Sequence, residues 1–480
     1  MKRNYNSTLI RLIIKETKIM KHSIKSWIAL ILFFVSATAM AQETKSGYFT
    51  EGYLYRYSMN PALGNDKNFV SIPALGNINV GLRSNIGVDN ILYNVNGKTT
   101  TFLNPNVSAA EFLKNVHDKN RIGTDVKVNV LSAGFKGFGG YNTISLNVRA
   151  NVGLTVPGSL LRLAKEGPEN KTYDIKDFNA HADAYVELGF GHSRQLNEQW
   201  NVGGTLKFLL GGGNVDAEFN NASLTLGEDQ WMATTDAKVQ TSVKGFTYKT
   251  TEKMRGAEGQ EVRHTYVDDV DVDGGGPNGF GLAVDLGAEF KLNKGWTFSA
   301  SLLDLGFINW NNNMVASTNG VQTFTTDRYI FNVDDNATNS FENEMDRLEE
   351  GIASLYELQD NGDQGSRTRM LGATLNLGAE YTFPLYDKLK FGLLNTTRIQ
   401  GEYSWTEFRL SANVSPLKWF GAGINTAVGS YGASFGWICS IHPKGYTLFL
   451  AMDHTLGSLA KQGLPLSGKG SVSLGMNIAF

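Results

Sequence analysis

The sequence predicts an all-β protein, a transmembrane antiparallel β-barrel of 14–16 strands. Three observations lead to this fold class. The N-terminus resembles a secretory signal, no later stretch is apolar and long enough for a membrane helix, and long segments alternate apolar with polar residues. A barrel of the bacterial outer membrane combines all three, because its strands alternate between lipid-facing and lumen-facing residues.

Residues 1–41 have the pattern of a signal peptide. Basic residues precede an apolar run at 27–35, and residues 39–41 (Ala-Met-Ala) supply the small side chains of a cleavage site. The apolar run is shorter than the roughly 20 residues that a membrane helix needs. Met20 is a more natural start than Met1. The signal predicts export, and with the alternation it predicts a place in the cell outer membrane.

Residues 42–75 precede the first clear strand and contain the sequence YSMNPA at 57–62. We predict that this segment is a periplasmic lead-in or a plug in the lumen, with a first strand as the alternative. The barrel is predicted to span residues 76–480.

The alternation is clearest at the C-terminus, where one face carries Val472, Leu474, Met476, Ile478 and Phe480. The same period of two, which is that of a β-strand, recurs at 144–153, 181–190, 280–291 and 371–383. A soluble sandwich also alternates. These runs reach ten residues, however, which suits membrane strands of about 9–11 residues better than globular strands of about 5–6. Aromatic residues at the strand ends suit the two membrane interfaces.

Counting strands backward from Phe480, with its end in the periplasm, sorts the connections by length. Short connections fall on the periplasmic side, at 137–140, 194–199, 227–230, 292–294, 384–387, 416–418 and 442–445. Long ones fall outside, at 87–125, 155–179, 246–278, 309–370 and 455–469. Outer-membrane barrels have this asymmetry. The count gives 16 strands, or 14 if 214–245 is a hairpin that extends beyond the membrane.

The strand pattern predicts a set of polar residues that face the lumen: Arg149, His181, Asp183, Glu187, Lys207, Asp285, Glu289, Lys291, Glu380 and Arg409. They indicate either a polar path for a solute or a salt-bridge network that holds a plug and braces the wall. The network is the plainer interpretation, since structural ion pairs account for most such groups.

Asp269, Asp271 and Asp273 begin like an EF-hand loop, but the position where a Glu is needed holds Phe280. They remain a weak candidate for a surface Ca²⁺ site, and a solvated acidic loop is the plainer reading. We predict no metal and no cofactor.

Residues 341–358 show an apolar stripe with helical spacing, which predicts one amphipathic helix in a long outer loop. We predict that this helix is a lid over the mouth of the barrel, with folding into the lumen or contact with a partner as the alternatives.

No nucleophile or metalloprotease motif appears among the residues, so we predict no enzyme. The net charge of −2 argues against a nucleic-acid partner.

Several segments resemble the DUF5723 family of Bacteroidetes outer-membrane proteins: GYLYRYSMNPAL from Gly52, IPALGNINVGLRSNIG from Ile72, GHSRQLN from Gly191, GFGLAVDLGAEF from Gly279 and LLDLGFINW from Leu302. The resemblance implies a membrane barrel and no known chemistry. More distantly, the segment around Pro61 is similar to the PorP/SprF and PorV families, which are tied to type IX secretion and gliding. FadL-type transport barrels share the general architecture, which is weak evidence of function.

Two functions follow as expectations. The first is a channel or transporter for small or amphiphilic solutes, because barrels of this size are wide enough for an aqueous path. The second is a structural or accessory component of a surface or type IX secretion machine. The expected partners are outer-membrane lipid and lipopolysaccharide, the barrel-assembly machinery and a surface or secretion-complex protein. Phe480, as a terminal aromatic residue, is the predicted assembly signal.

Overall fold

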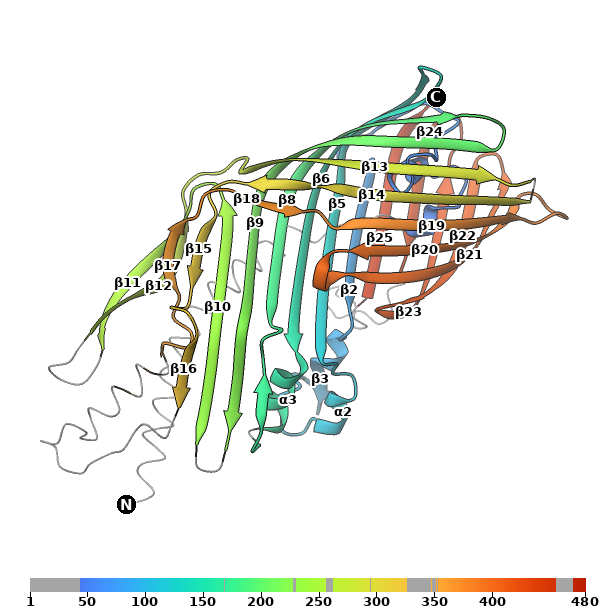
Figure 1. Ribbon diagram of the computed structural model, residues 1–480. Coiled ribbons are helices and arrows are strands. Elements are labelled where there is room, and N and C mark those ends of the chain that lie inside the picture. The colour runs from blue at the N-terminus through green and yellow to red at the C-terminus, as the bar shows by residue number, and fades with distance from the viewer. Residues whose placement is uncertain are drawn as a thin grey trace, which may run out of the picture.

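In the computed structural model the chain forms a closed antiparallel β-barrel of 14 strands (Figure 1). The structure describes residues 44–480 except 168, 228–229, 256–261, 294, 326–346, 348–350, 352 and 455–468, so the predicted signal peptide lies outside the described residues. Around the wall, the strands are β2 (Asn77–Ser84), β5 (Lys119–Gly137), β6 (Gly140–Pro157), β8 (Asn179–Gln195), β9 (Trp200–Leu226), β13 (Gly279–Lys291), β14 (Trp296–Trp310), β19 (Ala373–Thr382), β20 (Leu389–Ile399), β21 (Trp405–Leu417), β22 (Phe420–Gly429), β23 (Gly432–Ile441), β24 (Gly445–Met452) and β25 (Lys469–Ala479). β25 pairs with both β24 and β2 and so closes the ring.

The two ends of the barrel differ in the length of their connections. At the turn end, consecutive strands are joined at 138–139, 196–199, 292–295, 383–388, 418–419 and 442–444. At the loop end, the connections 85–118, 158–178, 227–278, 311–372 and 453–468 are long, whereas 400–404 and 430–431 are short. β25 ends at the turn end. The asymmetry predicted from the sequence is therefore present in the fold.

The number of strands is the smaller of the two predicted values. β9 pairs with β13 only as far as Gly211, and from Gly213 onward it pairs with β10 (Trp231–Val243) in a hairpin at the loop end. The segment 214–245 therefore adds no strand to the wall. The count of 16 is wrong for this reason, and so is the placement of 227–230 on the periplasmic side.

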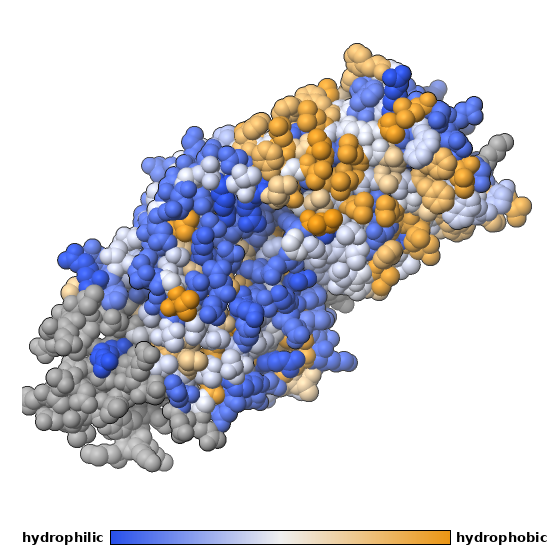
Figure 2. All heavy atoms as spheres, viewed as in Figure 1, coloured by the Kyte–Doolittle hydropathy of each residue, from blue (hydrophilic) through white to orange (hydrophobic). Residues whose placement is uncertain are grey.

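The side chains of the wall are sorted apolar outward and polar inward. On β9, Leu206 and Phe208 are exposed while Lys207 between them is buried, and on β25, Met476 and Ile478 are exposed while Asn477 is fully buried. Figure 2 shows the exposed apolar side chains gathered in a band over the part of the barrel near the turn end. An apolar outer surface of this kind is favourable in contact with lipid hydrocarbon. The closed ring of strands also satisfies the backbone hydrogen bonds, which lipid cannot do.

Beyond this band, β5, β6, β8 and β9 continue into a hydrophilic extension at the loop end (Figures 1 and 2). Further strands join it beside β9, β10 and β14: β7 (Thr172–Asp174), β15 (Met314–Ser317), β16 (Gln322–Thr325), β17 (Gln359–Asp363) and β18 (Arg367–Met370). Two hairpins stand apart from the main sheet: β3 (Leu92–Val95) with β4 (Lys98–Thr101), and β11 (Phe246–Arg255) with β12 (Val262–Val272). The helices here are short: η3 (Val88–Asn90), α2 (Ala109–Leu113), α3 (Gly158–Glu166) and η5 (Gly401–Tyr403). Among the described residues, no helix has the length and apolar character to cross a membrane.

Residues 44–68, which we call the luminal segment, lie within the barrel near the turn end. This segment contains two short helices, η1 (Lys45–Gly47) and η2 (Leu54–Ser58), and is followed by β1 (Phe69–Ser71). β1 pairs with β25 and β5, and the irregular stretch 72–76 that follows still hydrogen-bonds to both of these strands. The chain therefore enters the wall at Phe69 and continues in it to β2. The segment predicted as one unit, 42–75, thus contains both a luminal part and the start of the first strand.

Most of the predicted amphipathic helix at 341–358 lies outside the described residues. Its last residue, Leu358, packs with Phe246 and Tyr248 of β11. The Leu358 carbonyl also accepts a hydrogen bond from the Val267 amide of β12 at 2.7 Å. This end of the segment therefore contacts the β11–β12 ribbon.

Candidate luminal site

The luminal segment is held in the barrel by buried aromatic rings. Those that it contributes are Tyr48, Phe49, Tyr53, Tyr55 and Tyr57. The Tyr53 ring meets Phe449 of β24 edge-on, with 4.8 Å between ring centroids. The Tyr55 hydroxyl donates a hydrogen bond to Asn477 Oδ1 of β25 at 2.7 Å. The aromatic residues therefore combine apolar contact with the polar bonds that the interior of the wall offers.

Asn60 and its neighbours dock on the opposite part of the wall. The Met59 carbonyl accepts hydrogen bonds from Ser301 Oγ at 2.7 Å and from Asn376 Nδ2 at 2.9 Å. Asn60 is fully buried, and its Nδ2 donates to the carbonyls of Ala288 and Ala300, both at 3.3 Å. Satisfied buried amides of this kind fix a segment in one position.

Two glycines of the wall make this close approach possible. A Cβ atom on Gly287 of β13 would lie 2.1 Å from Asn60 Oδ1, and one on Gly203 of β9 would lie 2.3 Å from the Pro61 carbonyl oxygen. Any larger residue would displace the luminal segment. The glycines at these inward positions therefore act as the seat of the segment.

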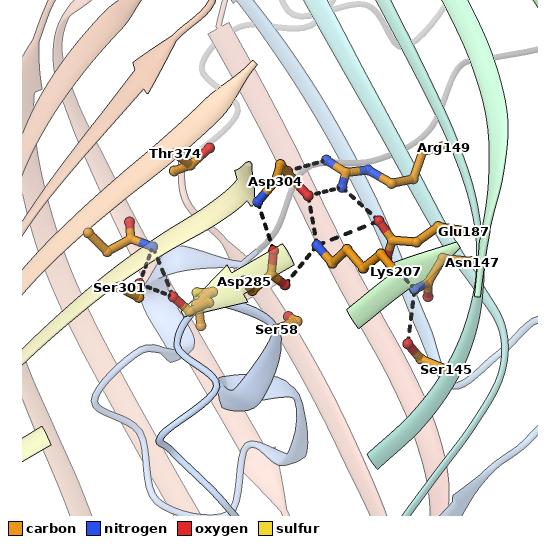
Figure 3. A network of polar contacts seen from close by, with 12 residues as sticks. Ser58, Ser145, Asn147, Arg149, Glu187, Lys207, Asp285, Ser301, Asp304 and Thr374 are labelled. Carbon is orange, nitrogen blue, oxygen red and sulfur yellow. Dashed lines mark hydrogen bonds and ion pairs between the residues drawn. The ribbon is translucent and has the colours of Figure 1, made fainter. Parts of the chain in front are cut away.

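A buried ionic network crosses the lumen beside the luminal segment (Figure 3). Lys207 Nζ lies 2.7 Å from both Asp285 Oδ2 and Asp304 Oδ1. Arg149 binds the two carboxylate oxygens of Asp304 at 2.8 and 3.0 Å, and it also contacts Glu187 Oε2 at 3.0 Å.

Asp304 is the centre of this network, because three cations contact it. Besides Arg149 and Lys207, Arg398 Nη1 lies 3.3 Å from Asp304 Oδ2. The three carboxylates and three cations balance in charge, which a buried ionic cluster requires.

A β-bulge brings Asp304 into the lumen. Asp304 has a φ of 59°, and the register of β13 against β14 shifts opposite it. Its amide donates to Asp285 Oδ1 at 2.7 Å. The bulge switches the parity of β14: Phe298 is exposed before it, and Leu305 and Phe307 are exposed after it.

A second polar cluster holds the start of the luminal segment. Asp453 accepts hydrogen bonds from the amides of Lys45 and Ser46, at 2.8 and 2.7 Å, and from Ser46 Oγ at 2.6 Å. Arg409 of β21 binds Glu407 at 2.7 Å and the Asp453 carbonyl at 3.1 Å. The cluster therefore ties η1 to β21 and to the end of β24.

Two large cavities lie on either side of these contacts. The turn-end cavity has a volume of about 830 Å³ and is lined by the luminal segment together with residues such as Glu289, Lys291 and His442. The loop-end cavity has a volume of about 710 Å³ and is lined by residues such as Asp216, Arg367 and Tyr403. The luminal segment and the ionic network occupy the lumen between them.

The polar residues predicted from the strand pattern fall into four places. Arg149, Glu187, Lys207 and Asp285 meet in the ionic network. His181 lies near the loop-end cavity, with its ring nitrogens 2.8 Å from Asp183 and 2.7 Å from Asp216.

The other predicted residues are closer to the turn end or to η1. Glu289, Lys291 and Glu380 line the turn-end cavity, where Lys390 links Glu380, at 3.3 Å, to Glu51 of the luminal segment, at 2.8 Å. Arg409 lies in the cluster around Asp453.

The sequence reasoning did not identify several central residues, namely Lys45, Arg83, Asp304, Arg398 and Asp453. Asp304 has the parity of the lipid-facing side chains that precede it, so only the parity switch between Phe298 and Leu305 could have revealed it. Lys45 lies outside any alternating segment, and no pattern in the sequence shows which strands it meets.

Two of the three residues predicted as a weak metal candidate lie in a strand. Asp269 and Asp271 belong to strand β12 and not to a loop, and Asp271 binds Lys249 of β11 at 3.0 Å. An extended strand spreads its carboxylates along one edge instead of folding them around an ion. Within the described ranges, no group of three or more His, Cys, Asp or Glu side chains has the geometry to hold a metal ion.

Phe480 is 71% exposed at the turn end. Its amide and carbonyl exchange hydrogen bonds of 2.9 and 3.0 Å with the carbonyl and amide of Asn68. The last residue is therefore paired by its backbone while its ring faces outward, and its role as an assembly signal stays a prediction.

Comparison with known proteins identifies one family, the family of unknown function DUF5723, which matches residues 61–453. No curated protein sequence matches the chain. Solved structures match most of the chain at low similarity. A TodX mutant described as a monoaromatic hydrocarbon channel has a TM-score of 0.42 at 8% identity, over 92% of this chain and 95% of that one. The Ralstonia pickettii toluene transporter TbuX has a TM-score of 0.37 at 8% identity, over 88% and 90%. A Pseudomonas aeruginosa FadL homologue has a TM-score of 0.34 at 10% identity, over 92% and 98%.

Proposed function

Because the chain belongs to DUF5723, a family of unknown function, we propose a function from its own geometry: it is an outer-membrane channel or transporter for small or amphiphilic solutes, with the luminal segment as its plug. The observation that carries this proposal is the division of the lumen. Two cavities of several hundred Å³, one near each end, are separated by the luminal segment and the ionic network. In this proposal the turn end faces the periplasm and the apolar band contacts lipid and lipopolysaccharide.

The polar lining of the two cavities supports the passage of solutes that carry water-soluble groups. Charged side chains such as Lys291, Glu380 and Arg367 border the cavities, and lumen charges are tolerated where water fills the space. The luminal segment meets the wall through hydrogen bonds, packed rings and an ion pair, so in this proposal its displacement breaks only non-covalent contacts.

The proposal is tested by solute flux through the purified full chain in liposomes. Asn60→Ala removes the hydrogen bonds that seat the segment on β13 and β14 and should raise the rate of liposome swelling by a neutral sugar. Asn106→Ala, an exposed position in the loop end, is the matched control and should behave as wild type. If correctly folded wild type and Asn60→Ala are both silent to all solutes tested, the channel proposal fails.

A second candidate is an accessory role in a surface or secretion machine. The hydrophilic extension with its β11–β12 ribbon favours it, since this surface projects beyond the apolar band (Figure 2). Cross-linking in native membranes distinguishes the two: a stoichiometric protein partner on the extension supports the accessory role, and its absence supports transport.

A further inference from the structure

A small cavity of about 70 Å³, which we call the central cavity, lies between the start of the luminal segment and the ionic network. Cationic side chains dominate its lining: Lys45, Arg83, Lys127, Arg149 and Arg398. Only two carboxylates line it, those of Asp125 and Asp304. Asp304 is engaged by Arg149 and Arg398, and Asp125 binds Arg83. The lining is thus rich in positive charge, and its carboxylates already have partners.

Two of the cationic groups present donors without an acceptor. Lys45 and Arg83 are each only 7% exposed, and neither Lys45 Nζ nor Arg83 Nη1 has a hydrogen-bond partner within the described part of the chain. Both cations lie over the ring of Trp405, at 4.3 and 4.4 Å from its centroid. Contact with a ring compensates part of the lost hydration. The N–H groups themselves remain unsatisfied, and buried charged donors are costly in that state.

A narrow cavity lies between the central cavity and the loop-end cavity. This narrow cavity, of about 20 Å³, shares Arg83, Asp125 and Trp405 with the central cavity. The same narrow cavity shares His181 and Tyr403 with the loop-end cavity. The three spaces therefore adjoin one another, and a solute in the loop-end cavity is close to the unpartnered cations.

We propose that the central cavity binds the carboxylate group of a small organic monoanion, with Lys45 and Arg83 each donating to one oxygen. The inference rests on the proposed transport function and names its substrate class. The two unpartnered donors, one on Lys45 and one on Arg83, match the two oxygens of a carboxylate. An ammonium and a guanidinium are the groups that proteins commonly use to hold carboxylates. Trp405 and Leu303 in the lining offer apolar contact to the carbon next to the carboxylate.

Isothermal titration of the full chain, folded in detergent micelles at pH 7, tests this inference without any measurement of flux. The probes are acetate and butyrate, with inorganic phosphate and chloride at equal ionic strength. The expected result is saturable carboxylate binding that exceeds binding of phosphate and chloride. Lys45→Met and Arg83→Gln should each weaken it about tenfold or more, since each removes a charged hydrogen bond. Lys114→Met, at an exposed position of the loop end, should leave it unchanged.

The results that would contradict the carboxylate site are the following. Absence of saturable carboxylate binding, unchanged binding in both Lys45→Met and Arg83→Gln, or tighter binding of phosphate overturns the carboxylate site. Arg83 lies in the wall and Lys45 in the luminal segment, so the two variants do not share one route to misfolding. A barrel that passes neutral sugar but binds no carboxylate overturns this inference alone, whereas binding without flux overturns only the proposed function.

Discussion

At the scale of single residues, Asp304 joins three cations of the ionic network. It contacts Arg149, Lys207 and Arg398, and a bulge with a positive φ places it there. The position of Asp304 depends on the backbone as well as on the charges. Removal of the Asp304 carboxylate should therefore weaken the whole ionic network.

Asp304→Asn should destabilise the folded barrel by about 3–5 kcal/mol, the usual cost of leaving buried charges without their partner. The change keeps the volume of the side chain but leaves three cations against two carboxylates. Guanidinium unfolding in detergent measures the effect. Asp387→Asn, at an exposed turn, is the control. Equal unfolding midpoints for the two variants would show that the network contributes little.

The protonation of Lys45 gives a second prediction. Burial lowers the pKa of Lys45 to about 8, and Glu407 partly opposes this effect. The charged groups that face Lys45 from the neighbouring elements are Arg83, Asp125, Glu407, Arg409, Asp453 and His454. Burial also lowers the pKa of His454 to about 4, so that His454 is already neutral at pH 7.

Lys45 is charged below its pKa and neutral above it, so the positive charge that Lys45 contributes to the central cavity is present at pH 7 and is lost as the pH rises through about 8. Carboxylate affinity should therefore fall between pH 7 and pH 9 in the wild type. In Lys45→Met it should be weak and nearly constant over the same interval. Titration calorimetry at several pH values checks both statements, and a wild-type affinity that rises with pH would contradict them.

At the scale of elements, the seat of the luminal segment depends on which face of a strand a glycine occupies. Gly203 and Gly204 are neighbours on β9 with opposite environments. A Cβ on Gly203 would lie 2.3 Å from the Pro61 carbonyl, whereas one on Gly204 would meet nothing closer than 3.5 Å.

Gly203→Ala should push the luminal segment away from the wall, at a cost of about 1–3 kcal/mol for overpacking, and should raise solute flux. Gly204→Ala is the matched control and should match the wild type in both properties. Unfolding midpoints and liposome swelling are the two measurements. Indistinguishable variants would show that the segment is not seated where the structure places it.

The elements also show what sequence can and cannot predict. Alternation identified the wall strands β6, β8, β13, β19 and β25, because a lipid-facing strand leaves a period of two in the chain. It did not separate the membrane part of β9 from its continuation beside β10, since the alternation persists beyond the band. It also failed at Asp304, where a bulge shifts the parity. The contacts of the luminal segment involve residues hundreds of positions apart, and these leave no local pattern.

At the scale of the whole molecule, the last strand meets the start of the barrel wall at the turn end. β25 completes the ring between β24 and β2, and Phe480 lies at its end with an exposed ring. An exposed terminal aromatic side chain stabilises little in the folded state, so its predicted role concerns assembly.

Deletion of Phe480 should therefore lower the amount of assembled barrel in the outer membrane without lowering the unfolding midpoint of the fraction that folds. Heat-modifiable mobility of membrane extracts measures the first quantity, and guanidinium unfolding measures the second. Phe480→Tyr, which keeps the aromatic ring, is the control and should assemble normally. Wild-type amounts of barrel without Phe480 would exclude the assembly role.

The pairing of Asn68 with Phe480, and of Tyr55 with Asn477, also sets an order of events in time. These bonds join parts of the chain more than 400 residues apart, so they form only after the final strand has arrived. The luminal segment precedes the barrel strands in the chain, but its hydrogen bonds to the wall are completed only when the last strand is in place. Contacts at such long separation are slow to form, so seating of the segment and closure of the ring are expected to be one late kinetic step, and a barrel caught before that step would be both unclosed and unplugged.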